Sequence, residues 1–201
     1  SAGVILVGSG HVEWITVGED GNGQVEIIWS DGAVGRFASH FSTTTVGNDG
    51  YLVVANETGN LNFLHYDAET GTWSEPLEVD VPLATVSTTQ ISASDTGEIF
   101  IVYDDILTGQ LFVIKTADDG LTWQFVESVR TPNFLTAEHA KFETPEHFTG
   151  NLIIMQQIEL PSDELVEGLY YHIIDTDGVD DPVLIGPDSG SDAYAADSFL
   201  F

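Results

Sequence analysis

The chain has 201 residues, and its 4 Lys+Arg against 33 Asp+Glu give a formal net charge of -29. So few cations cannot neutralise a phosphate backbone or an anionic bilayer, which excludes nucleic acid and membrane insertion. The absence of cysteine excludes disulfide frameworks, thiol nucleophiles and cysteine zinc sites, while the 42% of hydrophobic residues predict a folded core.

Short apolar stretches separated by glycine-containing turns follow one another along the chain. YLVVA (51–55) precedes LNFLHYD, IFIVY (99–103) precedes LFVIKTAD, and LIIM (152–155) precedes LYYHIID. No stretch has a 3.6-residue apolar period over ten or more residues, so helix should be minor. We predict antiparallel strands at 51–55, 61–66, 98–103, 110–116, 123–129, 151–156 and 168–174.

The strands recur with a period. Gly50, Gly97 and Gly150 are each predicted to close a turn just before an apolar second strand, and Trp73 and Trp123 occupy matching places. A period of about 50 residues with several short strands per unit is typical of propeller blades. A β-sandwich also has short strands at similar spacing, but the phase of the repeats favours the propeller.

The predicted fold class is therefore all-β: a β-propeller of about four four-stranded blades, or part of a larger propeller. One repeat domain, 1–201, is expected. The last segment would be a closing strand or the first strand of a further blade. The predicted blades are 3–38, 39–81, 82–130 and 131–187, and the last segment is 189–201.

One motif is specific. Thr116–Trp123 reads TADDGLTW, and Asp67–Trp73 (DAETGTW) is a degenerate copy in phase with it. The first copy resembles the Asp-box, or BNR repeat, of sialidase-like propellers, through Thr116, Asp118, Gly120 and Trp123. The resemblance implies a structural hairpin between third and fourth strands, on the face opposite the ligand, so these residues are not predicted to form a site.

The same resemblance raises the question of sialidase chemistry. Sialidases bind the sugar carboxylate with three arginines, and bidentate guanidinium pairing explains that choice. This chain has only Arg36 and Arg130, so no such triad can be assembled within it. A pair of glycosidase carboxylates is not excluded among so many acids. The preferred expectation is a chain without catalytic residues.

The resemblance places the ligand on the face formed by the second-to-third turns and by the segments leading into each first strand. Those segments hold three of the four cations and two histidines. Local neutralisation of carboxylates is the simpler interpretation, but the same rim could orient a polar sugar. The candidate ligand-binding residues are Arg36, His40, Asp104, Asp105, Arg130, Glu138, His139 and Lys141.

The stretch 175–181 (DTDGVDD) places acids at alternate positions around a glycine. Calcium takes six to eight oxygen ligands, so Asp175, Asp177 and Asp181 would need carbonyls or water to complete a shell. A solvated acidic turn is the simpler interpretation of the pattern. Calcium is the one cofactor that the sequence suggests.

The acidity and the fold together indicate a setting. Acids spread through the turns suit high salt, where repulsion is screened, or calcium-rich extracellular water. A basic partner is a third explanation. The sequence predicts a secreted or cell-surface module that binds glycan or protein or serves as a scaffold, joined to further blades or an assembly. The alternative is part of a polysaccharide-degrading glycosidase or lyase with its site on the channel face.

Overall fold

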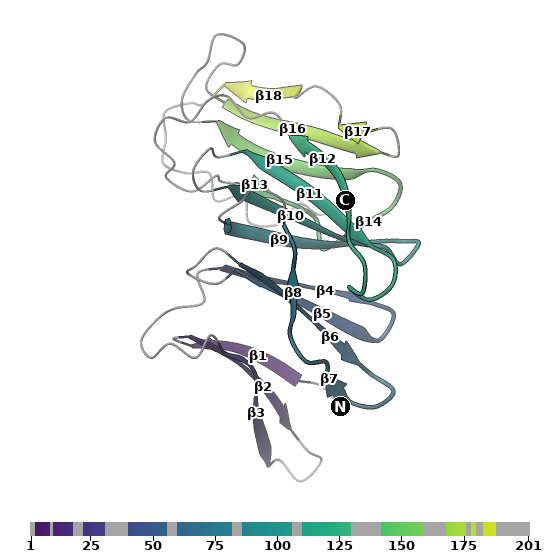
Figure 1. Cartoon of the computed structure of the whole chain (residues 1–201). Helices are drawn as coiled ribbons and strands as arrows, with labels where there is room; N and C mark the ends of the chain where they lie inside the picture. Colours follow the sequence, from purple (N-terminus) through teal and green to yellow (C-terminus); the bar gives the residue numbers. More distant parts are fainter. Residues whose placement is uncertain are drawn as a thin grey trace.

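The computed structural model describes residues 3–8, 10–17, 22–30, 40–55, 60–81, 86–105, 110–129, 142–158, 168–175, 178–179 and 183–187. These residues form strands and turns, and they contain no helix, which confirms the all-β prediction. None of the described elements is therefore a helix that could cross a membrane. The strands make four small sheets that lie one after another, as Figure 1 shows.

The first two sheets come from the first 79 residues. Sheet 1 has the order β1-β2-β3, and in sheet 2, of order β4-β5-β6, β7 and β8 both pair with β6. Sheet 1 consists of β1 (Gly3–Gly8), β2 (His11–Val17) and β3 (Gly23–Ser30). Sheet 2 consists of β4 (His40–Val46), β5 (Asp49–Ala55), β6 (Leu61–Asp67), β7 (Thr72–Trp73) and β8 (Leu77–Val79).

Of the other two sheets, sheet 3 includes one short strand, β14, that lies in the chain between two strands of sheet 4. Sheet 3 consists of β9 (Val86–Ser94), β10 (Ile99–Asp105), β11 (Leu111–Thr116), β12 (Gln124–Val129) and β14 (His147–Phe148). Sheet 4 consists of β13 (Phe142–Glu143), β15 (Leu152–Ile158), β16 (Gly168–Asp175), β17 (Gly178–Val179) and β18 (Val183–Pro187). All described pairings are antiparallel except that of β14 with β9, which is parallel.

The seven predicted strands correspond to β5, β6, β10, β11, β12, β15 and β16, with ends within two residues. One turn was placed wrongly. Gly50 lies inside β5, paired with Thr45, and the residue with positive φ in that turn is Gly47. Gly97 and Gly150 have φ of +86° and +80°, as tight turns favour.

The four described sheets follow one another in a row. Sheet 1 and the strands β15, β16 and β18 of sheet 4 lie at opposite ends of the stack (Figure 1). The predicted division into about four blades, of a complete propeller or of part of a larger one, stays a prediction, and residues 189–201 lie outside the described part.

Apolar side chains fill the three spaces between neighbouring sheets. Leu52 and Val54 pack with sheet 1, whereas Val53 on the other face of β5 packs with sheet 3. Sheet 3 repeats the arrangement, with Ile101 toward sheet 2 and Val102 toward sheet 4. Strands buried on both faces need continuous apolar runs, which explains YLVVA and IFIVY.

Strands β4 and β9, the first strands of sheets 2 and 3, are rich in polar residues, and these side chains form hydrogen bonds between the two sheets. The Ser42 hydroxyl lies 3.1 Å from the Gln90 side-chain oxygen and accepts from the Ile91 backbone N–H at 3.1 Å. Thr44 donates to the Glu146 carbonyl at 2.8 Å. Polar first strands thus join sheets 2 and 3 with the segment before β14.

His172 on β16 is a buried ionisable group. It faces sheet 3 beside Ile154, and burial lowers its pKa to about 4. The pKa of His172 is lower in the folded chain than the value near 6.5 expected in the unfolded chain. The neutral ring therefore contributes its full stability above pH 6.5, and this contribution is lost as the pH falls toward 4.

We expect the free energy of unfolding to fall by about 2 kcal/mol between pH 7 and pH 5, measured by urea unfolding. His172→Leu should remove this dependence and His147→Leu, at an exposed histidine, should keep it; equal slopes in all three proteins would contradict the assignment.

Candidate functional site

The strand directions define two ends of the stack. The turn end carries the first-to-second turns of sheets 2, 3 and 4, with Gly47, Gly97 and Gly150, and the third-to-fourth hairpins that follow β6 and β11. The loop end is where β5, β10 and β15 finish, at Ala55, Asp105 and Ile158. The predicted ligand face is the loop end.

Three of the eight candidate ligand residues lie in the described part, all at the loop end. His40 begins β4 opposite Ala55. Asp104 and Asp105 end β10, and both are buried. The Asp104 carboxylate accepts a hydrogen bond of 2.6 Å from the Thr88 backbone N–H, so it holds the beginning of β9 against β10. The Asp105 N–H donates to the Gln110 carbonyl at 2.9 Å.

The other candidates fall outside the described residues. The structure therefore brings Asp104, Asp105 and the start of β4 to one end, and the role of this rim in binding stays a prediction. The candidates outside the described part are Arg36, Arg130, Glu138, His139 and Lys141.

Two hydroxyls near this end were not anticipated. Thr89 and Tyr103 are cross-strand partners on β9 and β10, and their buried oxygens have no hydrogen-bond partner among the described residues. Burial raises the pKa of the Tyr103 hydroxyl above its ordinary value, so it remains protonated. The sequence IFIVYDD (99–105) changes from apolar to polar at its end, which could have drawn attention to Tyr103. Only Asp104 and Asp105 were selected from it as candidate residues.

At the turn end, Thr116–Trp123 forms a hairpin that Asp118 organises. One carboxylate oxygen accepts from the Thr116 hydroxyl at 2.7 Å and from the Thr122 N–H at 2.8 Å. The other accepts from the Thr122 hydroxyl at 2.6 Å, and Gly120 has φ of +84°. Both oxygens are engaged within the turn, so Asp118 serves the fold.

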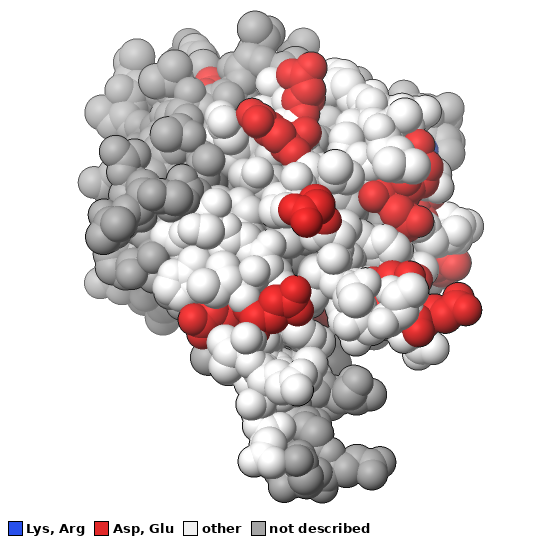
Figure 2. All heavy atoms as spheres, turned by 60° about the horizontal axis from the view of Figure 1, so that its bottom comes forward, with Lys and Arg blue, Asp and Glu red and all other residues white. Residues whose placement is uncertain are grey.

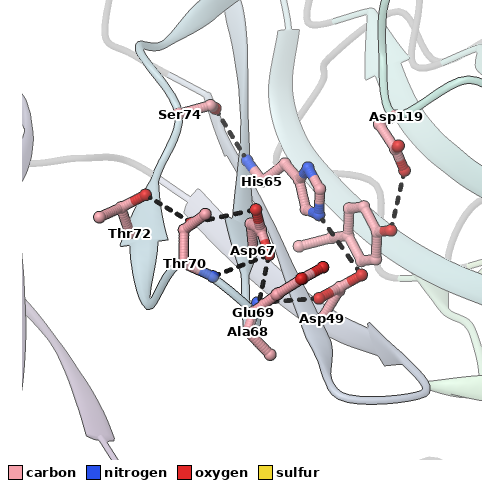
Figure 3. Close-up of polar contacts among 10 residues, drawn as sticks. Asp49, His65, Asp67, Ala68, Glu69, Thr70, Thr72, Ser74 and Asp119 are labelled. Atoms are coloured by element: carbon pink, nitrogen blue, oxygen red, sulfur yellow. Dashed lines mark hydrogen bonds and ion pairs between the residues drawn. The ribbon is translucent and has the colours of Figure 1, made fainter.

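The degenerate copy uses the same device with different spacing, as Figure 3 shows. One Asp67 oxygen accepts from the backbone N–H groups of Glu69 and Thr70 at 2.8 and 3.2 Å, and the other from the Thr70 hydroxyl at 3.0 Å. Hydrogen bonds from neighbouring threonines to the charged form lower the pKa of both Asp67 and Asp118, the Thr70 and Thr122 hydroxyls contributing most.

The tryptophans at the ends of the two hairpins pack on the preceding sheet. Trp73 lies edge-on to Trp14 of sheet 1 with ring centroids 5.6 Å apart, and Trp123 lies edge-on to Phe63 of sheet 2 at 5.2 Å. Edge-to-face aromatic pairs of this kind stabilise contacts beyond their buried area. Each hairpin thereby fastens its sheet to the one before it.

A polar cluster links sheets 2 and 3 at the same end (Figure 3). The Tyr51 hydroxyl donates to the Asp119 carboxylate at 2.9 Å, and the Tyr51 ring stacks on His65 at 4.8 Å. His65 lies 3.8 Å from Asp49. Burial, followed by the bond to Asp119, raises the pKa of Tyr51. A protonated, donating tyrosine is a link between sheets and not a nucleophile.

The charged side chains of the described residues are almost all acidic. Lys115 is the only Lys or Arg among the described residues, and it pairs with Glu98 at 2.7 Å near the turn end. On the face that Figure 2 shows, the Asp and Glu side chains lie in separate groups with other residues between them. Dispersed acids limit local repulsion.

The candidate calcium residues are only partly described. Asp175 ends β16, with its backbone paired to Gly178 of β17, and Asp177 and Asp181 lie outside the described part. Within that part, no group of three or more His, Asp or Glu side chains could hold a metal ion. The calcium site stays a prediction.

No protein-family model matches the sequence, and no curated protein matches it significantly. Solved structures do resemble it. The chain is similar to the NanB sialidase of Streptococcus pneumoniae, with TM-score 0.55 and 15% identity over 85% of this chain and 27% of that one. It is also similar to a Hadza microbial sialidase, with TM-score 0.54 and 13% identity over 87% of this chain and 40% of that one.

A third similar structure is the fucose-specific lectin of Aleuria aurantia, with TM-score 0.52 and 12% identity over 92% of this chain and 56% of the lectin. These neighbours have β-propeller folds. At such identities the likeness concerns the fold alone, which is that of a sialidase-like propeller. The chain spans less than two thirds of the length of each of these three proteins.

Proposed function

We propose that this chain is a non-catalytic β-propeller module that binds glycan at the loop end of its sheets. The observation that carries the proposal is the shared fold with two sialidases and a fucose-specific lectin. Enzymes that cleave sugars and a lectin that holds one use the same arrangement of sheets, so the fold can present sugar-binding loops; function still depends on the residues of the site.

The loop end has suitable chemistry. Sugar hydroxyls are recognised by carboxylates and cations through charge-assisted hydrogen bonds. The sequence places Arg36, Arg130 and Lys141 in segments leading to this end, beside Glu138 and the acids that close β10. Asp104, with its carboxylate bound to the Thr88 N–H, would position the neighbouring loop rather than touch the sugar. A secreted or cell-surface location in a saline medium belongs to the same proposal.

A glycan array, screened with and without calcium, tests this function. We expect a defined set of polar or acidic glycans to bind, and Arg130→Gln with Lys141→Gln to weaken binding ~10-fold or more by removing charge-assisted hydrogen bonds. Lys115→Gln is the matched control, because that cation lies near the turn end in a pair with Glu98. It should bind as the unmodified chain does.

The thermal melts of the Arg130 and Lys141 variants should match that of the unmodified chain, since the proposal assigns these side chains to the glycan and not to the fold. Binding that survives both substitutions would place the ligand elsewhere. An array without any bound glycan would refute the glycan-binding function, and cleavage of bound glycans would favour the polysaccharide-degrading alternative.

A further inference from the structure

Each sheet inside the stack has two apolar faces, and each face is covered by a neighbour. In sheet 2, Leu52 meets sheet 1 and Val53 meets sheet 3, and in sheet 3, Ile101 meets sheet 2 and Val102 meets sheet 4. We call the face of a sheet toward the preceding sheet in chain order its earlier face, and the face toward the following sheet its later face. In each of the three spaces, the later face of one sheet packs on the earlier face of the next. Within the described part of the chain, no sheet packs on the earlier face of sheet 1 or on the later face of sheet 4.

The uncovered face of sheet 1 is apolar. Val4, Ile15 and Val25 form a row across its three strands, on the side opposite Trp14 and the contact with sheet 2. Ile27 follows two residues after Val25 on the same face. Val4, Val25 and Ile27 are 56%, 61% and 62% exposed. Exposed aliphatic side chains grouped on one sheet face mark an interaction surface.

The later face of sheet 4, on the side away from sheet 3, carries aliphatic and aromatic side chains. Ile153 pairs with Ile173, and Tyr171 pairs with Val183, on the side opposite the Leu152 and Ile154 side chains that meet sheet 3. Val183 is 43% exposed. The face therefore has the aliphatic and aromatic character of the later faces that pack elsewhere in the stack.

We infer that these two faces bind a second copy of this chain head to tail, with sheet 4 of each copy packed on sheet 1 of the other. The contact continues the repeat of the three internal interfaces. Figure 1 places the two faces at opposite ends of the stack, so one copy cannot cover both by itself. A two-fold pair satisfies all four faces at once and closes the association.

Charge sets the conditions for this pair. Each copy carries a net charge of -29, so two copies repel at low ionic strength. On the sheet 1 face, Glu13 is the acid that pairs opposite Ile27, and its carboxylate lies 3.1 Å from the His11 ring. Salt should therefore strengthen the association by screening the repulsion between the two copies.

The test is sedimentation of the full chain over a concentration series at 1 M NaCl, where the Debye length is about 3 Å. We expect a species of twice the 21.7 kDa chain mass. Ile27→Glu and, separately, Val183→Glu should weaken dimerisation ~10-fold or more by placing a charge in a desolvated contact. Leu121→Glu adds the same charge at a 78% exposed turn residue outside both faces and should leave dimerisation unchanged.

Mixing the two defective variants separates this geometry from others. In a head-to-tail pair, the Ile27→Glu copy retains its sheet 4 and the Val183→Glu copy retains its sheet 1, so the mixture should recover one intact interface and a measurable heterodimer. Val25→Glu offers a second substitution on the sheet 1 face, and far-UV spectra show that each variant is folded.

Three outcomes would overturn the inference. A chain that stays monomeric at every concentration in 1 M NaCl has no such partner surface. Dimers that survive Val183→Glu but not Ile27→Glu pair sheet 1 with sheet 1. Dimers that survive both substitutions form through another surface. None of these results bears on glycan binding, which the array measures separately.

Discussion

Gly120→Ala is expected to destabilise the fold by about 3 kcal/mol, which corresponds to a melting temperature lower by roughly 10 °C. Gly120 has φ of +84°, where an alanine side chain is strained. A Cβ at this position would also lie 2.5 Å from two carbons of the Phe63 ring. Phe63 is fully buried, stacked near Tyr51 and edge-on to Trp123, so it has little room to move.

Gly71→Ala is the matched control. Gly71 occupies the corresponding hairpin of sheet 2 with φ of +72°, but the nearest atom to its Cβ would be the Tyr66 hydroxyl at 3.8 Å. It should lose only the backbone contribution of about 1 kcal/mol. Chemical unfolding of both variants measures the difference. Equal losses would show that Phe63 moves aside and that the contact between sheets 2 and 3 is softer than the structure indicates.

A rise in ionic strength from about 0.05 M to 1 M should raise the melting temperature by on the order of 10 °C. The reason is the net charge of -29, whose repulsion is shortened as the Debye length falls to about 3 Å. Salt also weakens attractive ion pairs, but this loss is small because Lys115–Glu98 is the only Lys–carboxylate pair among the described residues. Melts that coincide at both salt concentrations would mean that the carboxylates are already too dispersed to repel.

Calcium distinguishes screening from binding in the same experiment. Calcium chloride at matched ionic strength should act as sodium chloride does if only screening matters. A larger shift that disappears on replacing Asp175, Asp177 and Asp181 with asparagine would support the predicted calcium loop. Without an extra shift, the stretch 175–181 is a solvated turn.

Features set by neighbouring residues were predictable from the sequence. Strands β5 and β10 were found because a strand covered on both faces needs a short apolar run bounded by turn residues. The Asp118 hairpin is equally local, since both oxygens of its carboxylate bond within Thr116–Thr122. The misplaced turn at Gly50 shows the limit of this reasoning, because Gly47 and Gly50 are equally able to take positive φ in sequence terms.

The candidate site was predictable only in outline. Alternation of strand direction places Asp104, Asp105 and the start of β4 at one end, whatever the packing. The sequence does not reveal that Asp104 is buried and bonded to the Thr88 N–H, or that the Tyr103 hydroxyl is also buried, because burial depends on the neighbouring sheet.

By itself, the sequence determined the seven predicted strand segments, the turns at Gly97 and Gly150 and the acidic composition, since these follow from apolar patterning, backbone sterics and charge count. Only the tertiary structure decided that Trp73 and Trp123 pack on the preceding sheet, that β14 pairs in parallel with β9, and that Val25 and Val183 lie on uncovered faces. These features join residues far apart in the chain, and their energy comes from surfaces that exist only once the sheets are stacked.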